Sequence, residues 1–248
     1  MFFIFDVDGT LTPSRQRIDP YFEKWFHRWV ESVQDKGHST VLVTGSDYQK
    51  TVEQLGNSIV DNVEYCCNCL GNHVLHKNRL IHSYDFVPPT ELIDFLNKEL
   101  SQSSYTERYG NHIENRGSMI NFSVVGRNAQ GDQRTRYFEW DKLSCERLYI
   151  AEKINSTFDK ISAQAGGETG IDIIPKGKDK SQIIKYLDDS KVFFFGDRMD
   201  KGGNDEPLAT ALKIQNKNSE CIHVKNWTDT HEVLIDISSN VLDISVHI

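Results

Sequence analysis

The feature that most constrains this chain is a pair of aspartates, two residues apart, directly after an apolar segment. Residues 2–5 are Phe-Phe-Ile-Phe, and Asp6, Asp8 and Gly9 follow. In an extended chain, side chains at positions i and i+2 point to the same side, so both carboxylates converge, while Gly9 permits a sharp turn behind them. Two carboxylates that close are stable only with a cation between them or with one of them protonated. The segment therefore predicts a strand ending in a cation site, with an acidic surface turn as the alternative.

Composition and charge narrow the class of protein. The chain has 248 residues, of which 38% are hydrophobic, which is enough for one large or two modest domains. A net charge of −8 disfavours a nucleic-acid partner. No apolar run approaches the roughly 20 residues that span a bilayer, and the start lacks the basic segment of a signal peptide, so we expect no membrane partner.

The cysteines indicate a reducing compartment. There are five, without the spacing of a disulfide framework, which is typical of a cytoplasmic protein. Three of them, Cys66, Cys67 and Cys69, lie close to two histidines, so a zinc site is one interpretation. No second Cys-x-x-Cys pair completes such a site, and the sequence favours buried thiols at the end of a strand.

The pattern of apolar and polar residues predicts an α/β fold with a doubly wound parallel sheet that is interrupted by an inserted α+β domain. We expect the core to comprise residues 1–84 and 176–248, and the insertion to comprise residues 85–175. Expected core strands lie at 2–5, 39–43, 63–66, 191–195 and 221–224, with a hairpin around 77–78 and helices at 20–36, 47–55, 179–187 and 228–235. Expected insertion elements are a helix at 90–100, strands at 112–114, 119–125 and 171–174, and helical segments between 135 and 158.

This organisation brings three polar positions to one edge of the sheet. Asp6, Thr44 and Asp197 each follow a predicted parallel strand, and ligands of open α/β sheets bind beyond the carboxyl ends of the strands. We therefore expect a single site there, built from segments far apart in the sequence.

The residue types at this site suit phosphoryl transfer, which needs a nucleophile, a proton shuttle and donors for the phosphate oxygens. Asp6 can supply the carboxylate nucleophile and Asp8 the acid and base. Thr44 or Ser46, with the backbone N–H between them, can bind phosphate oxygens. Lys180, which opens a predicted helix, can place an ammonium between the nucleophile and the phosphate, although an ordinary exposed lysine is the alternative.

A second acidic segment completes the expected metal site. Asp197 and Asp205 flank a loop with two adjacent glycines, and their oxygens are hard ligands that suit Mg²⁺. Acidic loops of this kind are mostly solvated turns when they occur alone. Four such motifs in order, each after an apolar strand or at the start of a helix, favour a shared site.

The motif at residues 6–12, Asp-Val-Asp-Gly-Thr-Leu-Thr, resembles the first motif of the haloacid dehalogenase-type phosphotransferases. Residues 112–121 and 125–127, together with the motifs at 6–16, 45–47 and 196–205, resemble those of the eukaryotic-type phosphomannomutases over nearly the whole chain. The resemblance implies a haloacid dehalogenase-like core with a mobile cap of the C2b type. It also implies Mg²⁺-dependent interconversion of mannose 6-phosphate and mannose 1-phosphate through a phosphoaspartate, hexose 1,6-bisphosphate as activator, and a homodimer formed through the cap.

The resemblance also assigns roles to residues. The predicted metal site comprises Asp6, Asp8 (through its backbone carbonyl), Asp197 and Asp205, and Arg15 beside the first motif is expected to meet the substrate. The cap arginines Arg116, Arg127 and Arg134 are expected to hold the phosphate that is not being transferred, because the planar guanidinium pairs bidentately with phosphate. For Arg134, next to Arg136, a solvated helix face is the alternative. Asp172 is expected to bind sugar hydroxyls.

Two positions depart from the family pattern. Gly170 stands where the family has a serine, which removes a contact to the substrate, although Thr169 is adjacent. Thr44 stands where these mutases have glycine, and threonine there is usual in phosphatases of the superfamily. A Mg²⁺-dependent hexose-phosphate phosphatase is therefore the alternative function, and a non-catalytic sugar-phosphate sensor is a third.

Overall fold

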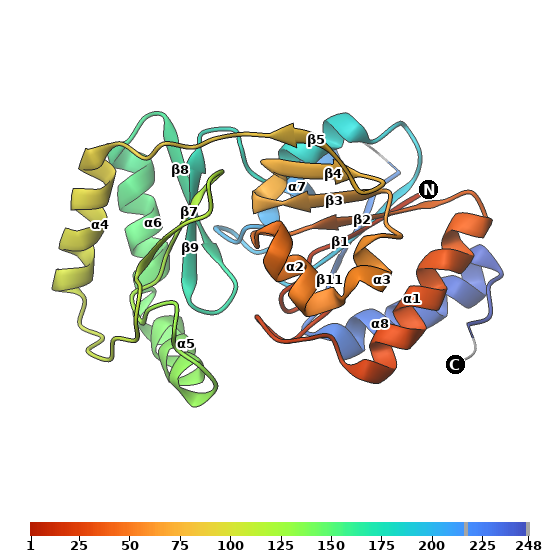
Figure 1. Ribbon diagram of the computed structural model, residues 1–248, viewed down its shortest axis with the longest axis horizontal. Helices are drawn as coiled ribbons and strands as arrows, with labels where there is room; N and C mark the ends of the chain where they lie inside the picture. The colour runs from red at the N-terminus through yellow and green to blue at the C-terminus, as the bar shows by residue number, and fades with distance from the viewer. Residues whose placement is uncertain (216–217, 247–248) are drawn as a thin grey trace.

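The computed structural model describes residues 1–215 and 218–246, and it divides into two lobes, each built on its own β-sheet. Figure 1 shows the lobes side by side, with both chain termini in the larger one. The chain passes from the larger to the smaller lobe after β5 (Arg79–Ser83) and returns after β9 (Gly170–Pro175).

The larger lobe contains a seven-stranded sheet in the order β11-β10-β1-β2-β3-β4-β5. The first five strands in that order run parallel, and β4 and β5 are added antiparallel at the edge. The strands are β1 (Phe2–Phe5), β2 (Ser39–Val43), β3 (Tyr65–Asn68), β4 (His73–His76), β5, β10 (Val192–Gly196) and β11 (Glu220–His223).

The central strands are apolar throughout because both faces of the sheet are covered. In β1, Phe3 and Phe5 point to one face and pack with α1 (Pro20–Asp35) and α8 (Trp227–Ile237). Phe2 and Ile4 point to the other face, where α7 (Glu206–Gln215) and the 3₁₀ helix η2 (Lys180–Tyr186) lie. Helices on both faces of a largely parallel sheet make this a doubly wound α/β fold, as predicted.

Helix α1 begins at the residue that the sequence predicts. Its N-cap, Asp19, accepts hydrogen bonds from the N–H groups of Tyr21 and Phe22, and Pro20 occupies the first turn. The face of α1 that packs on the sheet is largely aromatic; its buried residues are Phe22, Trp25, Phe26, Trp29, Val30 and Val33. Two shorter helices, α2 (Tyr48–Leu55) and α3 (Asn57–Val60), follow β2, and Asp47 caps α2.

The smaller lobe contains a four-stranded antiparallel sheet in the order β6-β7-β9-β8. Helices α4, α5 and α6 cover the side that faces away from the larger lobe, and the sheet faces the larger lobe (Figure 1). A separate hydrophobic core joins the sheet to these helices through Leu92, Tyr137 and Ile154. The remaining elements are β6 (Ile113–Asn115), β7 (Ile120–Phe122), β8 (Ile161–Gly166), α4 (Thr90–Gln102), α5 (Asp132–Ser144) and α6 (Glu146–Thr157).

The structure corrects several predicted elements. Strand β8 and helices α3 and α7 were not predicted, and the strand expected at 119–125 forms only at Ile120–Phe122. The expected helix at 179–187 is a 3₁₀ helix. The helical stretch expected from 135 begins at Asp132 and divides at Cys145, which adopts a left-handed backbone conformation with φ of 56°.

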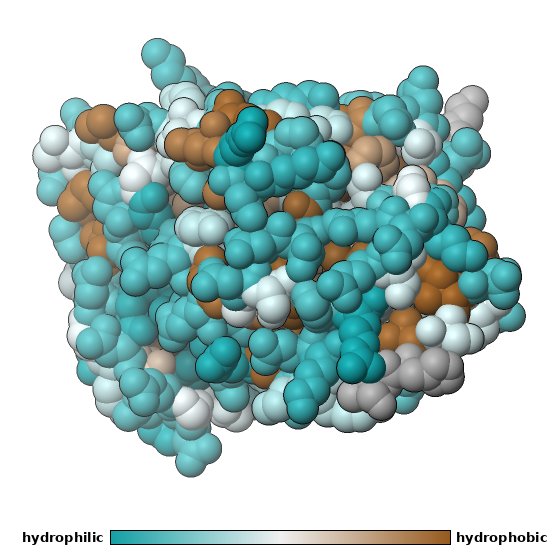
Figure 2. Space-filling view, turned by 45° about the vertical axis from the view of Figure 1, so that its right-hand side comes forward, coloured by the Kyte–Doolittle hydropathy of each residue, from teal (hydrophilic) through white to brown (hydrophobic). Residues whose placement is uncertain are grey.

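The three clustered cysteines are buried thiols, as the sequence favoured. Burial raises the pKa of both Cys66 and Cys69 to about 12. The surface is mostly hydrophilic on the face in Figure 2, where apolar areas are small and scattered. No helix in residues 1–215 and 218–246 is long and apolar enough to cross a membrane.

Candidate active site

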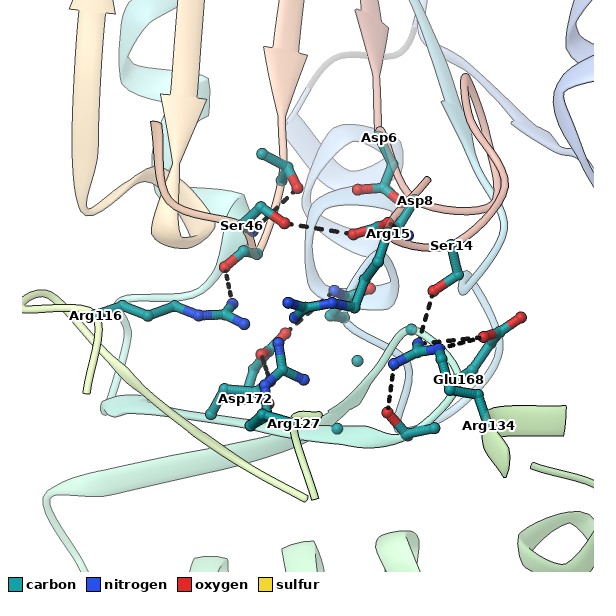
Figure 3. A pocket seen from close by; sticks show the side chains of 18 residues that line it. Asp6, Asp8, Ser14, Arg15, Ser46, Arg116, Arg127, Arg134, Glu168 and Asp172 are labelled. Carbon is teal, nitrogen blue, oxygen red and sulfur yellow. Dashed lines mark hydrogen bonds and ion pairs between the residues drawn. The ribbon is translucent and has the colours of Figure 1, made fainter. Parts of the chain in front are cut away.

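The two lobes enclose a polar cleft at the carboxyl ends of the parallel strands, drawn in Figure 3. The cleft has a volume of about 40 Å³. Its walls come from the first motif, the loop after β2, the β6–β7 hairpin, α5 and the turn between β8 and β9. The lining residues are Asp6, Asp8, Ser14, Arg15, Thr44, Gly45, Ser46, Arg116, Asn121, Arg127, Arg134, Gly166, Gly167, Glu168, Thr169, Gly170, Asp172 and Asn204.

Asp6 lies at the end of β1 and is held by a buried lysine. Lys180 donates to Asp6 Oδ1 at 2.6 Å and to Asp205 Oδ1 at 2.7 Å, and the lysine is fully buried. Burial lowers the pKa of Lys180, but the two carboxylates outweigh it, so the ammonium form is favoured. Burial raises the pKa of Asp6 well above its usual value, although Lys180 opposes this. Lys180 is thus a partner of the predicted nucleophile and not an exposed surface lysine.

Asp8 is oriented by the loop that follows it. Its Oδ1 accepts from the backbone N–H of Arg15 at 2.5 Å and from Gln54 Nε2 at 3.0 Å, and Ser46 Oγ donates to Oδ2 at 3.4 Å. The turn that follows Asp8 requires Gly9, whose φ is 80°. A Cβ there would meet Asp197 Oδ2 at 2.5 Å.

A third carboxylate, Asp197, completes a set of hard oxygen donors. Ligand atoms of Asp6, Asp197 and Asp205 lie within 4.8 Å of one another, and no other such group occurs among the described residues. Asp197 Oδ1 is buried without a hydrogen-bond partner in the described part of the chain. Burial, and then Asp205, raise the pKa of Asp197 to about 7. Crowded carboxylates with an unpaired oxygen fit a divalent cation with a preference for oxygen ligands.

The loop after β2 presents its polar groups to the cleft. Thr44 Oγ1 accepts from the Ser46 N–H at 3.1 Å, and both residues are buried. Gly45 approaches the opposite lobe so closely that a Cβ would meet Asp172 Oδ2 at 2.8 Å. Arg116 of the smaller lobe donates to the carbonyl oxygen of Gly45 at 2.5 Å, so the lobes touch at this loop.

Two arginines, Arg116 in the β6–β7 hairpin and Arg127 in the segment after β7, share one glutamate. Arg116 donates to Glu114 Oε2 from Nε at 2.9 Å and from Nη2 at 2.7 Å, and Arg127 Nε donates to the same oxygen at 3.1 Å. Both arginine side chains are 7% exposed. Arg15 extends from the larger lobe toward the same region (Figure 3). Burial, and then Arg116, lower the pKa of Arg15, as expected where positive charges gather.

The third predicted arginine, Arg134, points into the cleft from α5. Its Nη2 donates to Ser14 Oγ of the larger lobe at 3.1 Å, and its Nη1 donates to Thr169 Oγ1 at 3.2 Å. It also pairs with Glu168 Oε2 at 3.2 Å. Its neighbour Arg136 is half exposed and pairs with Glu107 outside the cleft. A solvated helix face therefore describes Arg136 and not Arg134.

Asp172 lies on β9 at the boundary between the lobes. Asn121 Nδ2 donates to Oδ1 at 2.7 Å, and Asn204 Nδ2 from the larger lobe donates to Oδ2 at 3.4 Å. Burial raises the pKa of Asp172, although Arg116 opposes this. A Cβ at Gly170 would meet Asn121 Nδ2 at 2.7 Å, so glycine leaves room for this amide.

A backbone contact also links the lobes beside the acidic loop. The N–H of Ala165, in β8, donates to the carbonyl oxygen of Gly202 at 3.1 Å, and Ala165 bridges to Gly203. The loop that carries Asp197 and Asp205 is thus joined directly to the turn that carries Glu168 and Thr169.

The structure brings all the predicted site residues together. Most of them line the cleft directly. Three are not part of the lining but lie next to Asp6: Lys180, Asp197 and Asp205. Sequence reasoning gave no role to Ser14, Gln54, Glu114 or Glu168. Of these four, only Glu114 could have been found from the sequence. It precedes Arg116 by two residues in an extended segment, so the two side chains are expected to point to the same side. The others meet the site through contacts between distant segments.

Comparison with known sequences shows the family. Residues 27–237 match the eukaryotic phosphomannomutase family. The chain belongs to this family. It is 33% identical to a phosphomannomutase of rice (Oryza sativa subsp. indica) over 213 residues, which covers 82% of this chain and 83% of the relative. It is also 33% identical to one of Arabidopsis thaliana over 219 residues (85% and 87% covered), and 32% identical to one of Babesia bovis over 213 residues (82% and 85% covered).

Comparison with solved structures shows the fold. The C-terminal domain of a trehalose-6-phosphate phosphatase from C. albicans superposes with a TM-score of 0.63 at 17% identity, covering 96% of this chain and 90% of that one. A sucrose-phosphatase from Synechocystis, solved with sucrose and phosphate, gives a TM-score of 0.53 at 13% identity, with 97% and 88% covered. The fold is therefore haloacid dehalogenase-like with a cap, as predicted.

Proposed function

We propose that the protein is a phosphomannomutase that interconverts mannose 6-phosphate and mannose 1-phosphate through a phosphoaspartate. One observation carries this proposal. The cleft joins a carboxylate pair and a buried lysine from one lobe to three arginines from the other. The first set can transfer a phosphoryl group, and the second can hold another phosphate at the same time.

The transfer step falls to Asp6. One of its oxygens is bound by Lys180 at 2.6 Å, which fixes the carboxylate and keeps positive charge beside it. The carboxylate attacks phosphorus, and the bond from phosphorus to the sugar oxygen breaks. Thr44, Ser46 and the Gly45 N–H lie where they can donate to the phosphate oxygens as charge develops on them.

The proton transfers fall to Asp8. It protonates the leaving sugar oxygen when Asp6 is phosphorylated, and it takes the proton from the attacking hydroxyl when the phosphoryl group returns to the sugar. Arg15 N–H, Gln54 and Ser46 hold its carboxylate in one orientation for both steps.

A Mg²⁺ ion fits the donor set of Asp6, Asp197 and Asp205, with the backbone carbonyl of Asp8 as a further ligand. When bound, it would offset the negative charge of the carboxylates and of the phosphate oxygens. Asp197, with its unpaired Oδ1, is the side chain with most to gain from a cation.

The arginines provide the second phosphate site. In a mutase, the sugar carries two phosphates between the transfers, and it must turn over before the second transfer. Arg116, Arg127 and Arg134, with Arg15, can bind the phosphate that is not reacting. Hexose 1,6-bisphosphate is then the activator, because it can phosphorylate Asp6. Asp172, with Asn121, is placed to bind sugar hydroxyls.

We further propose that residues 85–175 form a mobile cap on a core of residues 1–84 and 176–248. The cleft measures about 40 Å³, whereas pockets that enclose a small-molecule ligand measure roughly 300–1,000 Å³. The lobes must therefore separate before a hexose phosphate can enter.

Two further proposals concern assembly and location. Leu143 and Tyr149, on the outer helices of the cap, are 90% and 58% exposed, which supports a homodimer formed through the cap. The free thiols support a cytoplasmic location.

A coupled assay tests the mutase proposal. Mannose 1-phosphate with Mg²⁺ and a trace of hexose 1,6-bisphosphate should give mannose 6-phosphate. Release of inorganic phosphate without mannose 6-phosphate would make the protein a hexose-phosphate phosphatase instead. Thr44 is the observation that favours this second candidate, because its hydroxyl lies in the cleft where the family pattern has glycine. Absence of any Mg²⁺-dependent turnover would favour a sugar-phosphate sensor.

A further inference from the structure

The guanidinium of Arg134 is engaged on every side. Nε donates to Glu168 Oε2 at 3.2 Å, Nη1 donates to Thr169 Oγ1 at 3.2 Å, and Nη2 contacts both Ser14 Oγ and Glu168 Oε2. Figure 3 shows these contacts around Arg134 at one side of the cleft. Arg134 is therefore not an open site for phosphate in this state.

A second cap arginine, Arg127, differs. Among the described residues, the side-chain hydrogen bond of Arg127 runs from Nε to Glu114, which leaves its terminal nitrogens for a ligand. Among the described residues, Glu114 binds two arginines, Arg116 and Arg127, both 7% exposed, so it holds them together. Glu168 binds one arginine, and its side chain is 38% exposed on the turn after β8, where it can move away.

We propose that Glu168 is an internal anion that competes with the non-transferred phosphate for Arg134 and so weakens phosphate binding in the cleft. This rests on the proposed function and deepens it. Of the three groups bound by Arg134, Ser14 and Thr169 are neutral hydroxyls and only Glu168 carries a charge. When a phosphate binds Arg134, Glu168 has two alternatives. It can move away and lose its ion pair with Arg134, or it can stay beside a second anion that repels it. Both alternatives weaken phosphate binding.

This competition affects the step in which the bisphosphorylated sugar reorients between the two phosphoryl transfers. A cradle of unopposed arginines would hold one phosphate firmly and slow its release. Glu168 provides an alternative partner for Arg134 as the phosphate departs, so that the guanidinium is never left without an anion. Glu168 is in this sense a determinant of affinity, and it takes no part in the transfer of the phosphoryl group.

Direct binding measurements on the full-length protein test this. Titration calorimetry with Mg²⁺ would compare the wild type with Glu168→Gln, using inorganic phosphate and glucose 6-phosphate as separate probes. Gln has nearly the same size and keeps the hydrogen-bond acceptor, so only the charge is removed. We expect Glu168→Gln to bind both probes about tenfold more tightly, which is the scale of one contact charge in a partly solvated pair. Glu139→Gln is the matched control, because Glu139 pairs with Lys142 on the exposed face of α5.

The opposite role for Glu168 would be to orient Arg134 for phosphate. In that case Glu168→Gln would bind phosphate more weakly, and weaker or unchanged binding overturns the proposal. A double-mutant cycle makes the test specific. In an Arg134→Ala background the gain from Glu168→Gln should disappear, and a gain that persists there also overturns it.

Steady-state kinetics separates this proposal from the proposed function. Glu168→Gln should lower KM and lower kcat together, because tighter binding slows departure of the phosphate. A wild type that binds inorganic phosphate but converts no hexose phosphate would contradict the proposed function, while the comparison of phosphate affinities would still decide the role of Glu168. If neither protein binds either probe, both proposals fail.

Discussion

The two ends of the cleft solve opposite electrostatic problems. At the core end, among the described residues, four carboxylates (Asp6, Asp8, Asp197 and Asp205) face one buried ammonium, that of Lys180. At the cap end, three arginines already pair with two glutamates, Glu114 and Glu168. The core end therefore carries excess negative charge without an added cation, whereas each of the three cap arginines already has a glutamate partner before any ligand binds. The difference supports the two proposed roles: a cation site at the core end, and a site at the cap end where a phosphate replaces a carboxylate as the partner of an arginine.

The largest effect should come from the core end. Asp6→Asn should reduce turnover of any phosphate ester by about a thousandfold or more, because an amide cannot form the phosphoaspartate. The measurement is the Mg²⁺-dependent rate with mannose 1-phosphate and with an aryl phosphate. The melting temperature should not fall, since the substitution removes a crowded charge. Normal turnover of either substrate would show that Asp6 is not the nucleophile.

The next effect concerns stability at the core end. Lys180→Met should lower the free energy of unfolding by about 3–5 kcal/mol, because it leaves Asp6 and Asp205 buried without their shared partner. Urea unfolding monitored by circular dichroism would measure this. Lys142→Met on the exposed face of α5 should change it by less than about 0.5 kcal/mol. Equal losses in both variants would mean that the buried pair contributes no more than a surface pair.

The cap end should show selectivity between substrates. Arg127→Ala should lower kcat/KM for mannose 1-phosphate by roughly 10- to 100-fold, the range expected for losing a charged hydrogen-bond donor. It should leave hydrolysis of a small aryl phosphate within about twofold, because that substrate has no second phosphate for the arginine to bind. Similar losses on the two substrates would argue against a separate phosphate site in the cap.

The smallest effect is the dependence of cation binding on pH. Without a cation, the folded-state pKa of Asp197 is about 7, well above its usual value of 3.8, so the metal-free protein loses stability as pH rises through that interval. Mg²⁺ competes with this proton, and its stabilising effect should therefore grow between pH 6 and pH 8. Thermal melting with and without Mg²⁺ should show a difference on the order of 5 °C at pH 8, and less at pH 6. Asp197→Asn should reduce this dependence without abolishing it, because burial also raises the pKa of Asp6. A shift in the wild type that is the same at both pH values would contradict the prediction.

The sequence predicted the core end of the site better than the cap end, for a physical reason. Asp6, Thr44 and Asp197 each follow an apolar parallel strand, and the ends of such strands meet wherever the sheet forms. The partners of the cap arginines depend on tertiary contacts. Ser14 and Arg134 are separated by 120 positions in the sequence, and neither residue type indicates that the two form a hydrogen bond.

The missed elements have local causes. Strand β8 reads Ile-Ser-Ala-Gln-Ala-Gly, in which only Ile161 has a strong β propensity, so packing against α6 and pairing with β9 determine its structure. Helix α7 has only 10 residues, of which Leu208, Ala209 and Leu212 are buried, so its helical pattern of apolar residues is short. The chain after Lys180 has a helical pattern of apolar residues, but pattern alone does not distinguish an α-helix from a 3₁₀ helix.

The hydrogen bond from Ala165 to Gly202 has a consequence for the proposed motion of the cap. Because this bond joins the two lobes through backbone atoms, its amide hydrogen meets solvent only when the lobes part. Gly202 belongs to the acidic loop, so the proposed separation of the lobes would also free a main-chain restraint on that loop. Entry of a sugar and adjustment of the proposed ion site would then share a single opening event.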